Sequence, residues 1–129
     1  MATELIMLAL SIALGLTHVL LHGQAASLQR GYSWALSPRD STPEPLMGIP
    51  ARLERAMRNY LETFTFFAAT VMLAHTVGRH PEMMAAGSMI YFFSQLIYLP
   101  LYAFGVPVLR TVVWNLSILG IVVILLSVV

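Results

Sequence analysis

The chain of 129 residues contains no cysteine and no lysine, and only 10% of its residues are charged. The absence of cysteine excludes disulfides, a thiolate metal site and a cysteine nucleophile, so any thiol chemistry would use a thiol supplied by a ligand. A soluble domain has about a quarter of its residues charged. Here 58% of the residues are hydrophobic and the mean hydropathy is +0.78, which indicates a membrane protein.

Four apolar segments are separated by polar or turn-forming residues. A membrane-spanning helix needs about 20 apolar residues, so each segment is long enough for one span. The polar loop at about 30–50 contains four prolines, which preclude a continuous helix. We therefore expect one domain, 1–129, with the fold class of an all-α integral membrane protein and an antiparallel, up-down bundle of four transmembrane helices. The predicted spans are about 4–28, 51–77, 82–104 and 107–129.

All seven cationic side chains are arginine, and they are distributed unevenly along this topology. With four spans, only Arg79 lies on the side of the two termini. The positive-inside rule then places the polar loop in the cytoplasm and both termini outside. The compact loops favour a bacterial cytoplasmic membrane. The arginines on the loop side are Arg30, Arg39, Arg52, Arg55, Arg58 and Arg110.

A polar stripe opens the second predicted span, at positions i, i+3, i+4 and i+7 of one helical face. A charged group on a lipid-facing surface costs about 2.5–3.5 kcal/mol, so such groups face a bundle interior or water. Arginines that reach lipid head groups account for Arg52, but not for the deeper Asn59 and Glu62. An ion pair between Arg58 and Glu62 is a second structural interpretation. The stripe consists of Arg55, Arg58, Asn59 and Glu62.

A second stripe follows one face of the third predicted span, where Tyr91, Gln95, Tyr98 and Tyr102 recur at i, i+4, i+7 and i+11. Such residues form interfacial tyrosine belts, join helices or line a pocket, and the spacing alone does not choose among these roles. Arg110 begins the fourth predicted span on the same membrane side. It is either an ordinary positive-inside anchor or a part of a site formed with the two stripes.

The histidines offer a competing site. His18 and His22 have the i, i+4 spacing that binds a metal or the edge of a haem. His75 and His80 lie near the opposite membrane face in this topology, so the four cannot form one centre. We therefore expect no metal site, and we predict an interhelical hydrogen bond for His18.

Two motifs and the layout of the spans are informative together. The first motif is Glu54-Arg55-Ala56-x-Arg58-Asn59-x-x-Glu62-Thr63, followed by an aromatic-rich span. The second is Tyr98-x-x-x-Tyr102-x-x-Gly105-x-Pro107-x-x-Arg110-Thr111. Both motifs, the four-span layout and the polar loop after the first span resemble the MAPEG family, the membrane-associated proteins in eicosanoid and glutathione metabolism. The resemblance covers essentially the whole chain.

This resemblance implies a homotrimer that binds glutathione between neighbouring subunits near the cytoplasmic face. It assigns to Arg110 the role of stabilising the glutathione thiolate. Either Tyr98 or Tyr102 matches the pocket tyrosine of the family, and Trp114 stands where some members carry a further tyrosine. The residues that the resemblance assigns to glutathione binding are Arg55, Arg58, Asn59, Glu62, Tyr91, Tyr98, Tyr102 and Thr111.

The implied activity is that of a glutathione transferase acting on apolar electrophiles, with glutathione as co-substrate and peroxidase activity toward lipid hydroperoxides as a second reaction. The charges of the stripe suit this ligand, because glutathione carries two carboxylates and one ammonium group and the stripe offers two cations and one acid. The alternative is a non-catalytic trimeric membrane scaffold, in which the polar network of the second span serves assembly only.

Overall fold

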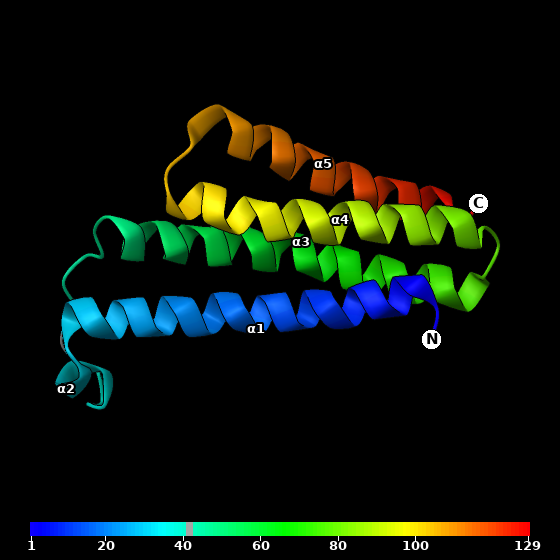
Figure 1. Cartoon of the computed structure of the whole chain (residues 1–129). Coiled ribbons are helices and arrows are strands. Elements are labelled where there is room, and N and C mark those ends of the chain that lie inside the picture. Colours follow the sequence, from blue (N-terminus) through cyan, green and yellow to red (C-terminus); the bar gives the residue numbers. More distant parts are fainter. Residues whose placement is uncertain (41–42) are drawn as a thin grey trace.

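The computed structural model describes residues 1–40 and 43–129, so positions 41–42 of the predicted polar loop lie outside the described residues. The described residues contain helices and no strand, which confirms the all-helical fold class. Four long helices run side by side, and a short helix lies beside the end of the first (Figure 1). The helices are α1 (Thr3–Arg30), α2 (Tyr32–Ala35), α3 (Ile49–Val77), α4 (Pro81–Ala103) and α5 (Pro107–Leu126).

Proline and glycine set the ends of the long helices. Pro50, Pro81 and Pro107 occupy the first turns of α3, α4 and α5, where the missing N–H leaves no helical hydrogen bond unmade. Gly78 ends α3 in the left-handed conformation, with φ of 66°. The turns between α3 and α4 and between α4 and α5 are short, and successive long helices run in opposite directions. The loop after α1 and the α4–α5 turn therefore share one end of the bundle (Figure 1).

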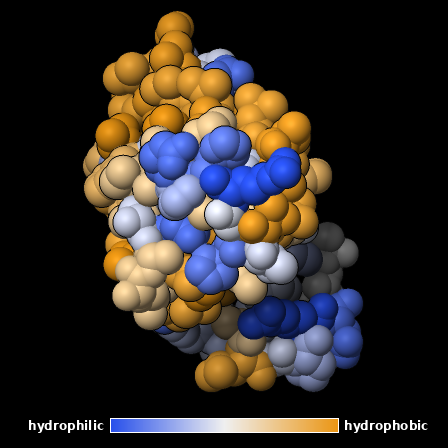
Figure 2. Space-filling view, turned by 90° about the vertical axis from the view of Figure 1, so that its right-hand side faces the viewer, coloured by the Kyte–Doolittle hydropathy of each residue, from blue (hydrophilic) through white to orange (hydrophobic). Residues whose placement is uncertain are grey.

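Among the described residues, three helices are long and apolar enough to cross a membrane, namely α1, α4 and α5. The predicted second span lies in α3, which is not among them because its first half carries the charged stripe. Hydrophilic side chains gather on the end of the bundle that holds the termini, and hydrophobic side chains surround them (Figure 2). This distribution fits an integral membrane protein.

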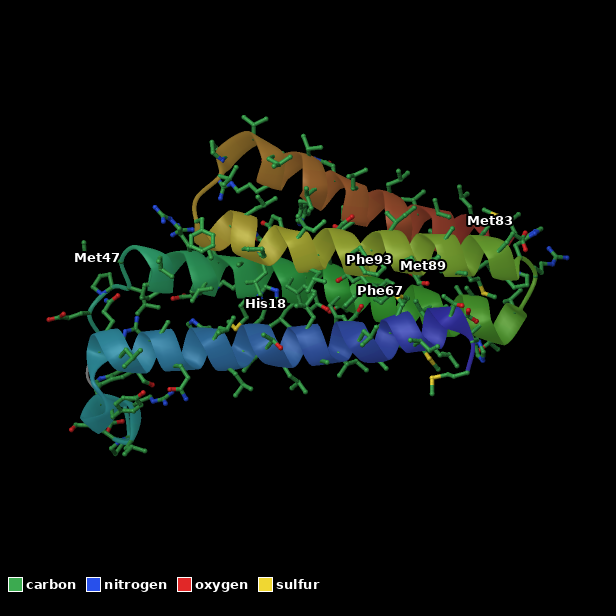
Figure 3. The ribbon with its side chains drawn as sticks, viewed as in Figure 1. His18, Met47, Phe67, Met83, Met89 and Phe93 are labelled. Atoms are coloured by element: carbon green, nitrogen blue, oxygen red, sulfur yellow. The ribbon has the colours of Figure 1, made fainter. Side chains whose placement is uncertain are left out.

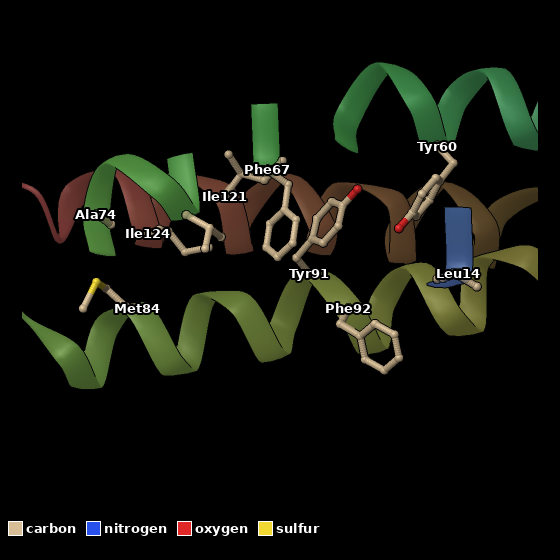
Figure 4. Packing of buried hydrophobic residues seen from close by; sticks show 10 residues of the cluster. Leu14, Tyr60, Phe67, Ala74, Met84, Tyr91, Phe92, Ile121 and Ile124 are labelled. Carbon is tan, nitrogen blue, oxygen red and sulfur yellow. The ribbon is translucent and has the colours of Figure 1, made fainter. Parts of the chain in front are cut away.

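Aromatic rings form the centre of the core where α3 meets α4. The rings of Phe67 and Tyr91 stack with centroids 3.9 Å apart, and the two lie side by side in Figure 4. The Tyr91 hydroxyl shares a hydrogen bond of 3.1 Å with Thr63. Between α4 and α5, the amide nitrogen of Gln95 donates to the Ser117 hydroxyl at 2.8 Å. Buried polar groups thus join the helices within the core.

Helices α4 and α5 are in close contact at a pair of glycines. A Cβ atom on Gly87 would lie 2.6 Å from the carbonyl oxygen of Gly120, and a Cβ on Gly120 would lie equally close to the Gly87 oxygen. Small residues allow membrane helices to pack with their backbones in contact. From this contact the two helices diverge toward the α4–α5 turn (Figure 1). The contact therefore opens a wedge at the arginine-rich end.

The prediction of an interhelical hydrogen bond for His18 was wrong. His18 lies between α1 and α3 (Figure 3), and its ring stacks on Tyr60 with centroids 4.6 Å apart. In the described part of the chain neither ring nitrogen of this buried histidine has a hydrogen-bond partner. The Tyr60 hydroxyl donates instead to the backbone oxygen of Ser11. The imidazole ring of His18 therefore packs face to face against the ring of Tyr60 on α3.

Candidate functional site

A cavity of about 260 Å³ lies between α3, α4 and α5 at the end where α4 and α5 diverge. Each of the three helices contributes side chains, and most of these side chains are polar or aromatic. The fold thus brings Arg110 of α5 to the same cavity as the two tyrosines of α4 and Asn59 of α3. The lining residues are Asn59, Tyr98, Tyr102, Arg110, Thr111 and Trp114.

Arg55 and Arg110 both contact Tyr102. The Nε atom of Arg55 donates to the Tyr102 hydroxyl at 3.2 Å. The guanidinium carbon of Arg110 lies 4.5 Å from the centroid of the same ring, within the range of a cation–π contact. Within residues 1–40 and 43–129, neither guanidinium forms an ion pair with a carboxylate. The cavity is therefore electropositive and suited to an anion.

Tyr98 is held from α3 in the same way as Tyr102. The amide nitrogen of Asn59 donates to the Tyr98 hydroxyl at 3.0 Å, and the two tyrosine rings meet edge to face with centroids 5.5 Å apart. Each hydroxyl oxygen accepts a hydrogen bond from α3, and neither hydroxyl proton has an acceptor among the described residues. Two O–H donors thus remain available to a ligand in the cavity.

The α5 wall of the cavity follows from helical spacing. Arg110 and Trp114 are four residues apart and lie on one face, and Trp114 is half-buried against the cluster of Tyr98, Tyr102 and Val113. Thr111 donates its hydroxyl to the carbonyl oxygen of Pro107 at 3.3 Å. The wall therefore combines one cation, one hydroxyl and one large aromatic surface.

Besides Arg55, three residues of the predicted binding set do not line the cavity. Arg58 is exposed and its Nη2 atom lies 2.5 Å from the carboxylate of Glu54. The alternative interpretation, an ion pair of Arg58 with Glu62, was therefore wrong, since the arginine turns toward the preceding helical turn. Glu62 is exposed, and Tyr91 is buried in the core. The cavity thus contains only part of the predicted set.

Arg52 has a role that the sequence did not indicate. Its Nη1 atom donates to the carbonyl oxygen of Ala103, the last residue of α4, at 3.5 Å. A Cβ atom on Gly105, where φ is 72°, would lie 3.2 Å from the guanidinium carbon. Cations near a helix C-terminus interact favourably with its free carbonyl groups. Arg52 therefore joins the start of α3 to the turn that positions Arg110.

The potential metal ligands lie apart from one another in the fold. In the part of the chain that the structure describes, no group of three or more histidine, aspartate or glutamate side chains is placed to hold a metal ion. His18 is enclosed by its stack on Tyr60, and His75 bonds through Nδ1 to Glu4 at 2.9 Å near the other end of the bundle. The cavity beside Arg110 is therefore the stronger candidate site.

Comparison with known proteins gives one positive result. The family model of the MAPEG family matches residues 7–129, which is nearly the whole chain. A search of curated proteins found no match. The matched segment contains all four long helices except the first residues of α1, and it includes every residue that lines the cavity. The chain is a member of the MAPEG family.

Proposed function

We propose that this protein is a membrane-bound glutathione transferase. The observation that carries the proposal is that Arg55 and Arg110 both contact Tyr102, which lines a cavity with no carboxylate among its described lining residues. Glutathione carries two carboxylates and a thiol that must ionise. Nearby cations stabilise the charged form of all three groups. The family to which the chain belongs includes glutathione transferases, together with members of other function.

In the proposed complex Arg55 and Asn59 bind the peptide, while Arg110 stabilises the sulfur anion. A free thiol has a pKa of about 8.5, which leaves about 3% thiolate at pH 7. A neighbouring guanidinium that lowers the thiol pKa to about 7 raises this fraction to about half. The hydroxyl protons of Tyr98 and Tyr102 then serve as donors to the sulfur or to a carboxylate.

The proposed reaction is a nucleophilic substitution. The thiol proton passes to solvent, the sulfur anion forms a bond to the electrophilic carbon, and a halide or other leaving group departs with its electron pair. An apolar electrophile partitions into the bilayer and reaches the cavity from the lipid side, beside Trp114. Reduction of lipid hydroperoxides by the same thiolate is a second reaction that this site would support.

The proposed assembly is a homotrimer in which α3 provides a fourth span and the arginine-rich end faces the cytoplasm of a bacterium. Ligand pockets usually have volumes of about 300–1,000 Å³, and this cavity of about 260 Å³ falls below that range. Arg58 and Glu62 remain exposed on α3. A neighbouring subunit that covers α3 would bring these side chains into a larger shared site.

The test is the rate at which the purified protein conjugates glutathione to an aromatic halide. If Arg110 shifts the thiol pKa as described, Arg110→Ala lowers the rate about fifteenfold at pH 7. Arg79→Ala, at the other end of the bundle, is the matched control and should leave the rate unchanged. Absence of glutathione binding to the wild type by calorimetry would refute the proposed function.

The second candidate is a trimeric membrane scaffold without catalysis. It is favoured by the finding that Arg55 and Asn59 already have partners on α4, which a purely structural network also requires. Glutathione distinguishes the two candidates, because a ligand stabilises only the state that binds it. A rise in melting temperature with glutathione supports the enzyme, while an unchanged value together with smaller oligomers in Asn59→Leu supports the scaffold.

A further inference from the structure

A second cavity lies between α1 and α2, on the opposite side of α1 from the other long helices. Among the described helices, α2 packs on α1 alone (Figure 1). The two helices and the residues after α2 enclose about 240 Å³. Small residues on α1 leave space for the cavity, and the Trp34 ring together with Arg30 and Arg39 closes it. The main lining residues are Val19, Gly23, Ala26, Arg30, Trp34 and Arg39.

The mouth of this cavity carries two fixed cations. The guanidinium carbons of Arg30 and Arg39 lie 5.3 and 5.5 Å from the centroid of the Trp34 ring. Backbone carbonyl oxygens hold them further: Arg30 donates through Nε to Glu44 at 3.0 Å, and Arg39 donates through Nε and Nη2 to Ala35. Neither cation pairs with a carboxylate in the described ranges. Two oriented guanidinium groups thus retain their charge for an anion.

A third polar group at the cavity also has no partner. The Nδ1 atom of His22 is buried and, within the described residues, makes no hydrogen bond. His22 belongs to the lining of this cavity, and the described lining residues include no aspartate or glutamate. An unsatisfied buried polar atom is unfavourable unless something binds to it. This nitrogen is itself enclosed, so Arg30 and Arg39 are the groups that suit an acceptor-rich anion such as a phosphate.

An exposed apolar stripe continues from the cavity along α1. Ile12, Leu16 and Val19 follow one another at i, i+4 and i+7, and their side chains are 48%, 61% and 46% exposed. This is the helical face that also carries Gly23 and Arg30. Because α1 is one of the candidate membrane spans, the cations lie at its polar end and the stripe lies at hydrocarbon depth.

We propose that the α1–α2 cavity binds an anionic phospholipid. The phosphate lies against Arg30 and Arg39, and an acyl chain follows the stripe of Ile12, Leu16 and Val19. Charge selects an acidic head group over a zwitterionic one, because the described lining of the cavity has cations and no acid to receive an ammonium group. The apolar stripe selects a lipid over a free phosphate ion, which would leave that surface without a partner.

The test compares three probes on the purified full-length protein in detergent: phosphatidylglycerol, phosphatidylcholine with the same acyl chains, and inorganic phosphate. We expect phosphatidylglycerol alone to raise the melting temperature and to remain bound in native mass spectrometry. Gly23→Leu should weaken phosphatidylglycerol binding at least tenfold. A Cβ atom at Gly23 meets nothing within 4 Å, so the new side chain has room and occupies the cavity.

Ala13→Leu is the matched control, since residue 13 is an exposed position of α1 outside the cavity. Arg39→Gln provides a second variant that keeps the cavity open, and it should reduce the preference for phosphatidylglycerol over phosphatidylcholine about tenfold. Equal binding of the two lipids overturns the proposal, as does unchanged binding in both variants. Stabilisation by inorganic phosphate equal to that by phosphatidylglycerol also overturns it, because the cavity would then serve a soluble anion.

Discussion

The guanidinium carbon of Arg110 lies 4.5 Å from the ring centroid of Tyr102, so the first turn of α5 is held against the last turn of α4 by a cation over an aromatic face. The hydroxyl of the same tyrosine accepts a hydrogen bond from Arg55 on α3. One side chain therefore sets the distance between two cations from different helices. Substitution by phenylalanine or leucine separates the contribution of the Tyr102 ring from that of its hydroxyl.

Tyr102→Phe should leave the thiolate of bound glutathione largely intact, whereas Tyr102→Leu should deplete it. Phenylalanine keeps the ring that orients Arg110 and loses the hydrogen bond from Arg55 and one hydroxyl donor, while leucine also removes the aromatic face. The measurement is the ultraviolet absorbance of the thiolate in the glutathione complex across pH. Equal loss in the two variants would show that the hydroxyl, and not the ring, maintains the ionised sulfur.

Gly120→Ala should destabilise the protein by about 1–3 kcal/mol, the usual cost of overpacking. The added methyl group would lie 2.6 Å from the backbone oxygen of Gly87, and this oxygen cannot move without a shift of α4. Gly23→Ala is the control: its methyl group meets nothing, so it should be neutral or stabilise the helix by up to about 1 kcal/mol. Thermal unfolding in detergent measures both.

How much of this fold can be predicted from the sequence depends on how far apart along the chain the interacting residues lie. Apolar segments and helical periodicity predicted the all-helical class and the faces that bear Asn59 and Tyr98, because both signals are local. The contact of Gly87 with Gly120 was not predicted, since a helical glycine does not indicate which helix approaches it. That contact opens the wedge, so the cavity itself needed the structure.

The ion pair of Arg58 shows the limit within a single helix. Glu54 and Glu62 are both four residues away, and spacing alone favours neither. Side chains on a helix point toward its N-terminus, and an acid that precedes a base by four residues is the better orientation. Arg58 accordingly pairs with Glu54. This directional rule would have corrected the prediction from sequence alone.

His18→Phe should stabilise the fold by about 1–2 kcal/mol. Phenylalanine keeps the stack on Tyr60 and removes two buried nitrogens that lack hydrogen-bond partners among the described residues. Chemical or thermal unfolding of the variant beside the wild type measures the difference. Destabilisation of similar size would mean that a bound water or another group satisfies the histidine in the folded protein.

Tyr91→Phe and Tyr98→Phe separate packing from ligand binding on one face of α4. Tyr91 is fully buried and bonds to Thr63, so loss of its hydroxyl should lower stability by about 0.5–1.5 kcal/mol and leave the Kd for glutathione within about twofold of wild type. Tyr98 lines the cavity and keeps a free hydroxyl proton, so Tyr98→Phe should weaken binding about fivefold to tenfold.

Calorimetry with glutathione and thermal unfolding, applied to both variants, decide the point. The two substitutions remove the same atom from the same residue type on the same helix, so any difference between them comes from position. If Tyr91→Phe weakened glutathione binding as much as Tyr98→Phe, the ligand would extend along α4 into the bundle. The core around Phe67 and Tyr91 would then have to open in the complex, because in this structure their rings stack at 3.9 Å and leave no room between them.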